Sequence, residues 1–285
     1  MKILITGSAG FVGKNLFYKL KDNYEVFGIS RRQSDTTTHS VDLTSDKIIS
    51  VLNKINPDIV VHCAALSNVD YCEEHKKEAE LQNVKSTSHL ASWTKKNNKK
   101  LIFISTDYVY GGEESDYDEE SNTSPVNLYG KTKLDAENMV RRLDNFAILR
   151  TSTVFGYDKG SKNFLMQLLF TTSPRKIPID QISNPTNVDI LIEYIKKIIE
   201  KNVKGIFVAT GPESMSRLEF ANLIAEIFKL DKKLLIAAKT NELGQIARRP
   251  LNNGTNSQKI RAILSLKVPG VRESLINIRE SLKNE

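Results

Sequence analysis

Residues 3–13 read Ile-Leu-Ile-Thr-Gly-Ser-Ala-Gly-Phe-Val-Gly, so that Gly7, Gly10 and Gly13 stand three residues apart directly after an apolar run. Apolar residues with helical spacing follow them. A strand, a glycine-rich turn and a helix in this order form a phosphate-binding unit, because glycines let the backbone approach a pyrophosphate at the helix N-terminus. This stretch therefore predicts an α/β domain that binds a dinucleotide.

The remaining chain continues this alternation of short apolar runs and helical patterns. Apolar runs of this length are typical of strands buried on both faces of a parallel sheet. The expected strands cover residues 2–6, 25–30, 59–63, 101–105, 147–150 and 206–209, and the expected helices cover residues 14–21, 45–55, 77–96, 131–143, 188–201 and 216–228. Repeated βαβ units predict a Rossmann-type, doubly wound parallel sheet.

After Arg150 the pattern becomes less regular and richer in proline. We therefore expect a cofactor-binding domain made of residues 1–155 and 187–211. A small C-terminal substrate-binding lobe, made of residues 156–186 and 212–285, would then cap the carboxyl ends of the strands, where ligands of open α/β sheets bind.

Composition is that of an ordinary soluble globular protein, with 40% hydrophobic and 26% charged residues. The sequence shows neither a signal-peptide pattern nor an apolar run near the roughly 20 residues that span a bilayer. Two cysteines, Cys63 and Cys72, indicate reduced thiols, so we expect a cytoplasmic protein without a membrane partner. The four histidines and two cysteines lack metal-ligand spacing, and we interpret His62 as a packed core residue.

The net charge of +7 raises the question of nucleic-acid binding. The lysines are spread along the chain, however, and no nucleic-acid-binding motif accompanies them. We therefore expect no nucleic-acid partner. A basic surface equally suits a small anionic substrate such as a nucleotide.

Tyr129 and Lys133 stand four residues apart at the start of an expected helix and so share one of its faces. An ammonium beside a phenol lowers the pKa of the phenol, and such a tyrosine can protonate a carbonyl oxygen as hydride reaches the carbon. Thr106 follows the expected strand 101–105, where its hydroxyl can hold the carbonyl. The alternatives are a chance Tyr-x-x-x-Lys spacing and an ordinary loop threonine.

Several motifs together resemble one family. They are Gly7-x-x-Gly10-x-x-Gly13, Cys63-Ala64-Ala65, Ser105-Thr-Asp-Tyr-Val-Tyr-Gly111, Pro125-Val-Asn-Leu-Tyr-Gly-Lys-Thr-Lys133, Leu149-Arg-Thr-Ser152, Asn184-Pro-Thr186 and Arg249-Pro250. The chain resembles the extended short-chain dehydrogenase/reductases and, among them, the dTDP-4-dehydrorhamnose reductase group. The resemblance runs over nearly the whole chain and implies that Thr106, Tyr129 and Lys133 form the catalytic trio.

The resemblance also implies binding positions. For the cofactor these are Gly7, Gly10, Phe11, Val12, Gly13, Ser30, Arg31, Arg32, Asp42, Leu43, Cys63, Ala64, Ala65, Asn83, Tyr129 and Lys133. For the substrate they are Asp70, Thr106, Asp107, Tyr108 and Thr153. Asn83 could equally be an ordinary helix-surface residue, and Asp70 could equally be a helix N-cap.

Two positions depart from related enzymes. Related dehydratases carry Thr-Asp-Glu where this chain has Thr-Asp-Tyr108, and a tyrosine cannot replace a carboxylate base at neutral pH, so dehydration is disfavoured. The reductase group usually has a tryptophan where this chain has Thr153, which leaves the identity of the sugar open.

The choice between NADP and NAD depends on the end of the second expected strand. Enzymes that use NAD commonly place an acidic residue there, whereas arginines accommodate the 2′-phosphate of NADP. This chain has Ser30-Arg31-Arg32 and no acidic residue before Asp35. We therefore expect NADP, with NAD as the alternative if the arginines are merely solvated.

These observations favour an NADP-dependent reductase acting on the 4-keto group of a nucleotide-activated 6-deoxysugar, as in dTDP-rhamnose biosynthesis. One alternative is a cofactor-binding regulatory subunit, because the chain also resembles the β subunit of methionine adenosyltransferase. Another is a nucleotide-sugar epimerase. For the assembly, a homodimer is a hypothesis.

Overall fold

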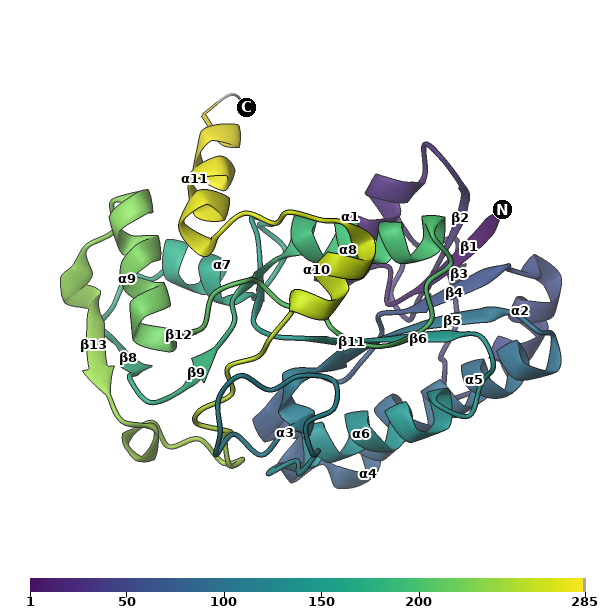
Figure 1. Cartoon of the computed structure of the whole chain (residues 1–285), viewed down its shortest axis with the longest axis horizontal. Coiled ribbons are helices and arrows are strands. Elements are labelled where there is room, and N and C mark those ends of the chain that lie inside the picture. Colours follow the sequence, from purple (N-terminus) through teal and green to yellow (C-terminus); the bar gives the residue numbers. More distant parts are fainter. Residues whose placement is uncertain (284–285) are drawn as a thin grey trace.

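The computed structural model describes residues 1–283 and contains a seven-stranded parallel sheet (Figure 1). In spatial order its strands are β11 (Gly205–Val208), β6 (Phe146–Thr151), β5 (Lys100–Thr106), β4 (Ile59–His62), β1 (Lys2–Thr6), β2 (Glu25–Ser30) and β3 (His39–Ser40). The chain order reverses between β1 and β4, which makes a crevice at their carboxyl ends. This sheet confirms the predicted doubly wound fold, and each of the six predicted strands lies in it.

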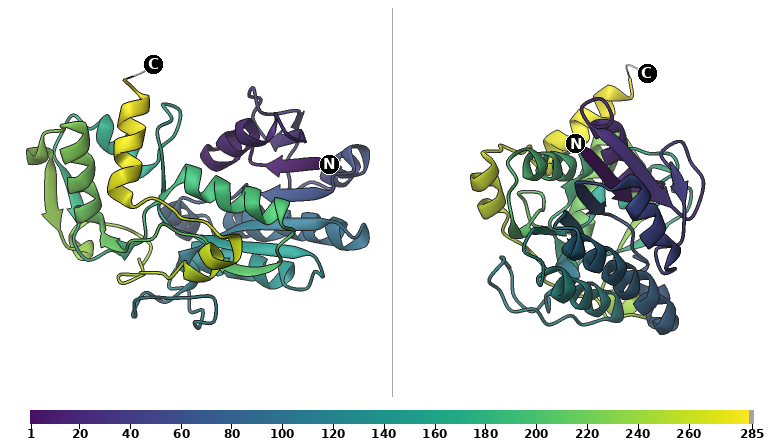
Figure 2. Two further views of the ribbon diagram at one scale, coloured as in Figure 1. Left: turned by 45° about the horizontal axis from the view of Figure 1, so that its top comes forward. Right: turned by 90° about the vertical axis from the view of Figure 1, so that its right-hand side faces the viewer.

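Helices cover both faces of the sheet (Figures 1 and 2). One face packs against α1 (Phe11–Leu20), α8 (Val188–Glu200) and α10 (Gln258–Leu264), and the other against α2 (Lys47–Ile55), α5 (Ser86–Lys96) and α6 (Leu128–Val140). Strand residues alternate between the two apolar cores, with Ile3 and Ile5 in one and Leu4 in the other. Burial on both faces explains why these strands are continuous apolar runs.

Asparagines set two helix boundaries, and the second matters for the site. Asn56 ends α2 in the left-handed conformation with φ 47°, and Pro57 after it cannot continue a helix. Asn127 begins α6, because its side chain accepts a hydrogen bond from the Gly130 backbone N–H. This cap places Tyr129 in the first turn of α6, at the carboxyl edge of the sheet.

A smaller lobe with its own apolar core lies beyond the carboxyl ends of the strands (Figure 1). Its helices are α7 (Phe164–Leu169), α9 (Arg217–Phe228) and α11 (Val271–Ser281). Its strands are β8 (Arg175–Pro178) beside β13 (Leu235–Ala238), and β9 (Ile182–Ser183) beside β12 (Met215–Ser216). The short strands β7 (Val154–Phe155) and β10 (Thr186–Asn187) pair where the chain passes between sheet and lobe.

The segment between α9 and α11 returns to the sheet, because α10 buries Ile260 and Leu264 in the core beside α8. Helix α10 thus packs on the sheet, although its residues fall in the range expected for the lobe. The domain boundaries inferred from sequence stay a prediction. Helix α11 was not expected, although its buried residues Val271, Leu275 and Ile278 have helical spacing. Helix α7 has only six residues, which is too short for a periodic signal.

The helix expected over residues 77–96 is interrupted. It consists of α4 (Lys76–Glu80), the π-helical turn η1 (Leu81–Lys85) and α5, and it follows the short helix α3 (Val69–Glu74). Single π-turns are frequent at functional sites. This one contains Asn83, whose side chain it turns inward so that the residue is 2% exposed.

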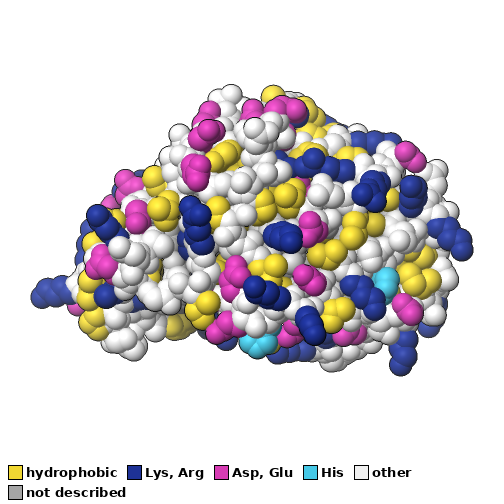
Figure 3. Space-filling model, turned by 90° about the horizontal axis from the view of Figure 1, so that it is seen from below, with side chains coloured by type: hydrophobic (Ala, Val, Ile, Leu, Met, Phe, Trp, Pro, Cys, Tyr) yellow, Lys and Arg dark blue, Asp and Glu magenta, His cyan; other side chains and the backbone are white. Residues whose placement is uncertain are grey.

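Basic side chains do not gather into one patch on the face seen in Figure 3, where lysines and arginines alternate with acidic residues. Among residues 1–283, no helix has the length and apolar character needed to cross a membrane.

Candidate active site

The glycine-rich turn between β1 and α1 forms a cradle that only glycine permits at two positions. Gly7 has a left-handed φ of 66°, and a Cβ there would lie 2.8 Å from the Ala64 backbone. A Cβ at Gly13 would lie 2.3 Å from the Gly7 carbonyl oxygen. Helix α1 begins after Gly10 without a side-chain cap or an acidic residue in its first turn. The cradle therefore fits the pyrophosphate of a dinucleotide.

Two cavities meet at this cradle. The central cavity, of about 550 Å³, extends toward α6, and the edge cavity, of about 290 Å³, extends along the end of β2. Of the predicted residues, the central cavity is lined by Gly7, Gly10, Phe11, Val12, Gly13, Cys63, Ala65, Thr106, Asp107, Tyr108, Tyr129, Lys133 and Thr153. The edge cavity is lined by Gly7, Gly10, Ser30, Arg31, Arg32, Leu43, Cys63, Ala64 and Ala65. Tertiary structure thus brings most of the predicted residues to one connected hollow.

The three predicted catalytic residues lie at the junction of β5 and α6. Thr106 ends β5, Tyr129 stands in the first turn of α6, and Lys133 follows one turn later. The Lys133 ammonium donates a 2.7 Å hydrogen bond to the Ile104 carbonyl and lies 3.9 Å from the centre of the Phe103 ring. These contacts hold Lys133 against the end of β5, beside Thr106.

The lowered pKa expected for the Tyr129 phenol is wrong for this structure. Burial raises the pKa of the Tyr129 phenol above its ordinary value, and a hydrogen bond with Thr106 opposes this only in part. The Lys133 ammonium is turned to the Ile104 carbonyl, and burial lowers its own pKa to about 7 against the pull of Glu137 and Cys63. Tyr129 therefore stays protonated at neutral pH, the state in which it can donate a proton.

The Asp107 carboxylate is buried and fully hydrogen-bonded by the protein. It accepts hydrogen bonds from the hydroxyl of Thr106 at 3.2 Å, the hydroxyl of Ser152 at 2.7 Å and the amide of Asn253 at 3.0 Å. Asp107 thus ties the end of β5 to the segment after β6 and to the lobe. Asn253 was not singled out from sequence, because nothing local relates residues so far apart in the chain, and Ser152 stood there only as the last residue of the motif Leu149-Arg-Thr-Ser152.

Asp70 is not the helix N-cap that was considered as an alternative. Asn68 begins α3, and its side chain accepts a hydrogen bond from the Tyr71 backbone N–H. Asp70 instead accepts a 2.9 Å hydrogen bond from the Ala247 backbone N–H and forms a 2.9 Å ion pair with the Arg249 guanidinium. It therefore connects α3 to the lobe.

Asn83 is not the helix-surface residue of the alternative interpretation. Its buried side-chain amide accepts a hydrogen bond from the Leu66 backbone N–H and donates hydrogen bonds to the Leu66 carbonyl and the Thr132 hydroxyl, so it orders the loop after β4 against α6.

Asp42 accepts hydrogen bonds from the Thr44 backbone N–H and the Thr44 hydroxyl. Asp42, Asp70 and Asn83 are not among the described residues that line the central, edge and outer cavities, and their ligand contacts stay predictions.

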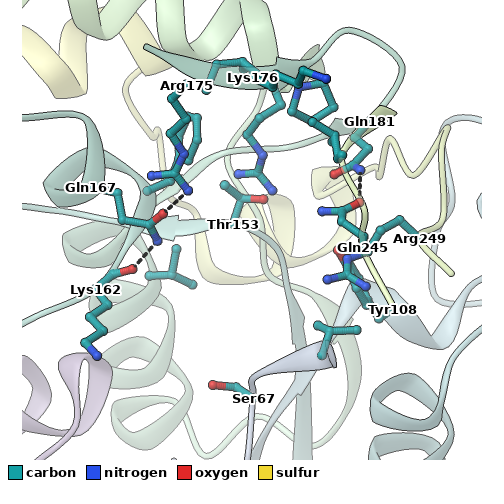
Figure 4. Close-up of a pocket in the computed structure, with 17 residues that line it drawn as sticks. Ser67, Tyr108, Thr153, Lys162, Gln167, Arg175, Lys176, Gln181, Gln245 and Arg249 are labelled. Atoms are coloured by element: carbon teal, nitrogen blue, oxygen red, sulfur yellow. Dashed lines mark hydrogen bonds between the residues drawn. The ribbon is translucent and has the colours of Figure 1, made fainter. Parts of the chain in front are cut away.

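The outer cavity, of about 660 Å³, lies between the lobe and the end of the sheet (Figure 4). Its lining includes five cationic side chains and no acidic one; the cations are Lys162, Arg175, Lys176, Arg217 and Arg249. Clefts lined by one sign of charge concentrate ligands of the opposite sign. The sequence indicated this cluster only through the net charge of the chain, because residues from separate segments form it.

The central and outer cavities adjoin, since Tyr108, Thr153 and Arg217 line both. Thr153 has a φ of 41°, which is uncommon for a β-branched residue, and its hydroxyl lies 3.0 Å from that of Ser183 in the lobe. A ligand that extends from one cavity into the other passes this residue.

Comparisons with known proteins agree with this arrangement. A family model described as RmlD substrate binding domain matches residues 1–284. The chain is 30% identical to dTDP-4-dehydrorhamnose reductase of Aggregatibacter actinomycetemcomitans, over 98% of either protein. It is also 30% identical to methionine adenosyltransferase 2 subunit beta of Rattus norvegicus, over 96% of this chain and 87% of that protein. A crystal structure of dTDP-4-dehydrorhamnose reductase from Bacillus anthracis in complex with NADP matches with a TM-score of 0.90, at 29% identity, over 98% of this chain and 99% of that one.

Proposed function

Because the chain belongs to the RmlD substrate binding domain family, we propose that it is an NADP-dependent reductase of a nucleotide-activated sugar. The reaction is reduction of the 4-keto group of a 6-deoxysugar carried by a nucleoside diphosphate. One observation carries the proposal: Thr106, Tyr129 and Lys133 line the same cavity as the glycine cradle, and that cavity borders the cation-rich outer cavity.

This arrangement supports a division of roles between the cavities. The glycine cradle and the edge cavity would hold NADP, with Lys133 near the nicotinamide ribose. The outer cavity would hold the substrate diphosphate, because the cations Arg175, Lys176 and Arg217 line it and attract an anion. The keto sugar would then lie between them, beside Tyr108 and Thr153.

The chemistry follows from the residues of this junction. NADPH supplies a hydride when it is bound. The Thr106 hydroxyl orients the substrate carbonyl, and Tyr129, which burial keeps protonated, donates its proton to the carbonyl oxygen. The product alcohol thereby gains one hydride on carbon and one proton on oxygen. Lys133 then offers a nearby charge that stabilises the phenolate left on Tyr129.

The direct test follows NADPH absorbance after addition of enzymatically prepared dTDP-4-dehydrorhamnose. We expect oxidation of NADPH by the wild-type chain and the matching reduced sugar nucleotide as product. Parallel reactions with UDP-linked keto sugars define the nucleotide. A chain that binds NADPH but oxidises it with none of these substrates would contradict the proposal.

Arg31 and Arg32 give a test of the cofactor. Both side chains are exposed and line the edge cavity beside Ser30, whereas Asp35, the first acidic residue after β2, does not line it. Replacing both arginines by alanine should raise the KM for NADPH about tenfold or more, since each hydrogen bond to a charged group is worth roughly 1.5–3 kcal/mol. The KM for NADH should change little, because NADH has no 2′-phosphate. If the KM values for NADPH and NADH rose equally, the arginines would not be ligands of the 2′-phosphate.

Lys133 gives a test by pH. Burial lowers its pKa to about 7, so the fraction of charged Lys133 falls as the pH rises above that value. Tyr129 stays protonated over the same range, because its pKa is raised. We therefore expect kcat/KM for reduction to be level below about pH 7 and to decrease above it, as measured from about pH 6 to pH 9. In Lys133→Arg, whose side chain cannot lose its proton, the decrease should disappear, although the plateau is lower. A wild-type profile that stays level to about pH 9 would exclude this role for the charge.

A second candidate function is a cofactor-binding subunit of another enzyme. The observation in its favour is a sequence identity: this chain is 30% identical both to the methionine adenosyltransferase subunit of Rattus norvegicus and to the bacterial reductase. This candidate predicts NADP binding without sugar turnover, together with co-elution with a methionine adenosyltransferase catalytic subunit. An epimerase would instead retain its nucleotide through purification and consume no cofactor.

A further inference from the structure

The loop of residues 156–163, between β7 and α7, brings residues of the lobe to the glycine cradle. Its last three residues, Ser161, Lys162 and Asn163, line the central cavity together with Gly7, Gly10 and Gly13. Lys162 also lines the outer cavity. The loop thus stands where the proposed cofactor and substrate sites meet.

An ion pair fastens this loop to α1, the helix whose N-terminus completes the cradle. The Lys14 ammonium lies 3.2 Å from the Asp158 carboxylate, which is 12% exposed. Asp158 also shapes the loop. Its side chain accepts a hydrogen bond from the Gly160 backbone N–H, and its backbone carbonyl accepts a hydrogen bond from the Ser161 backbone N–H. The turn that carries Lys162 is therefore tied to the helix at the phosphate end of the cofactor site.

Lys162 is the one of the three loop residues whose side chain has no protein partner within residues 1–283. The Ser161 hydroxyl accepts hydrogen bonds from Asn163, and the Asn163 amide caps α7 and donates to the Gly156 carbonyl. The Lys162 ammonium makes neither a hydrogen bond nor an ion pair there, and only its backbone carbonyl is engaged, by Gln167. Figure 4 shows its side chain extending away from Arg175 and Gln167, toward the pale purple helix α1.

We propose that Lys162 is a ligand of the cofactor diphosphate that is supplied by the lobe. The identity of that cofactor rests on the proposed function. A flexible ammonium is a common phosphate ligand, and the cradle itself contributes backbone N–H groups rather than a charged side chain. When Lys162 engages the diphosphate, the loop of residues 156–163 is held over the cofactor, and the wall that it forms for the outer cavity becomes ordered. Cofactor binding should then strengthen the binding of the substrate diphosphate, and by linkage the substrate diphosphate should strengthen cofactor binding equally.

The first experiment measures NADPH affinity by fluorescence titration and requires no turnover. Lys162→Met keeps the unbranched apolar stem of the side chain and removes its charged end, and the exposed position leaves the fold undisturbed. We expect the Kd for NADPH to rise about tenfold, as for the loss of a hydrogen bond to a charged group, and to depend less on salt. Lys159→Met is the matched control, because Lys159 is exposed on the same loop but lines neither cavity, and its Kd should match that of the wild type.

The second experiment tests the coupling between the sites with dTDP and UDP as probes. The wild type should bind the probe more tightly when saturated with NADP⁺, and Lys162→Met should lose this enhancement. Asp158→Asn, which releases the loop from α1, should also weaken NADPH binding. Its effect should not add to that of Lys162→Met, because both changes disable the same contact.

Two outcomes would overturn the inference. One is an unchanged Kd for NADPH in Lys162→Met, and the other is a variant in which only probe binding is weakened, which would assign Lys162 to the substrate alone. Failure of the proposed function looks different, because the wild type would then bind NADPH normally and reduce no keto sugar.

Discussion

Tyr129→Phe should lower kcat for keto-sugar reduction by about 10²–10⁴-fold, the usual contribution of a positioned general acid. The variant keeps the ring that packs against Tyr108, with 5.9 Å between ring centres, and loses only the hydroxyl. Because the glycine cradle and the edge cavity are untouched, the Kd for NADPH should stay within about twofold of the wild type. Stopped turnover with normal cofactor binding would place Tyr129 in the chemical step.

Tyr108→Phe is the matched control for this experiment. Tyr108 lines the same cavity, and burial likewise raises the pKa of its phenol. Its hydroxyl is not expected to transfer a proton, so the change in kcat should be far smaller than for Tyr129→Phe. Full activity of Tyr129→Phe, or equal losses in both variants, would mean that Tyr129 is not the proton donor.

Arg150→Met should cost about 3–5 kcal/mol of unfolding free energy, the usual penalty for leaving one member of a buried ion pair alone. Arg150 on β6 is 1% exposed, and its guanidinium contacts the fully buried Glu137 of α6 at 2.9 Å. Glu137 also accepts a 2.6 Å hydrogen bond from Ser105 on β5. The pair thus joins α6 to the two strands beside Thr106 and Lys133.

The loss should be read from urea unfolding, with the double variant Arg150→Met/Glu137→Met as control. Removing both charges leaves no uncompensated carboxylate, so the double variant should recover much of the stability. Arg141, which also contacts Glu137, places the single variant toward the lower end of the range. A loss below about 1 kcal/mol in Arg150→Met would show that solvent or Arg141 compensates the carboxylate.

Local sequence was sufficient for the features that depend on neighbours in the chain. The glycine spacing predicts the cradle, because tight turns and close backbone approach exclude other residues at Gly7 and Gly13. The six predicted strands are found because burial on both faces requires continuous apolar residues. The dinucleotide site and the helix that carries Tyr129 and Lys133 follow from these elements.

Properties that depend on burial or on distant segments required the tertiary structure. The pKa of Tyr129 is raised rather than lowered, because desolvation outweighs a charge whose ammonium is turned to the Ile104 carbonyl. The interruption at η1 turns Asn83 inward, which helical periodicity cannot show.

By itself, the sequence determined the fold class and the glycine cradle and suggested the candidate catalytic side chains, because apolar runs, glycine spacing and short motifs are local in the chain. Only the tertiary structure decided what surrounds them. The cations of the outer cavity and the carboxylate–amide contact of Asp107 with Asn253 join segments far apart in the chain. Such contacts are selected by packing of the lobe against the sheet edge, and packing leaves no periodic signal in the sequence.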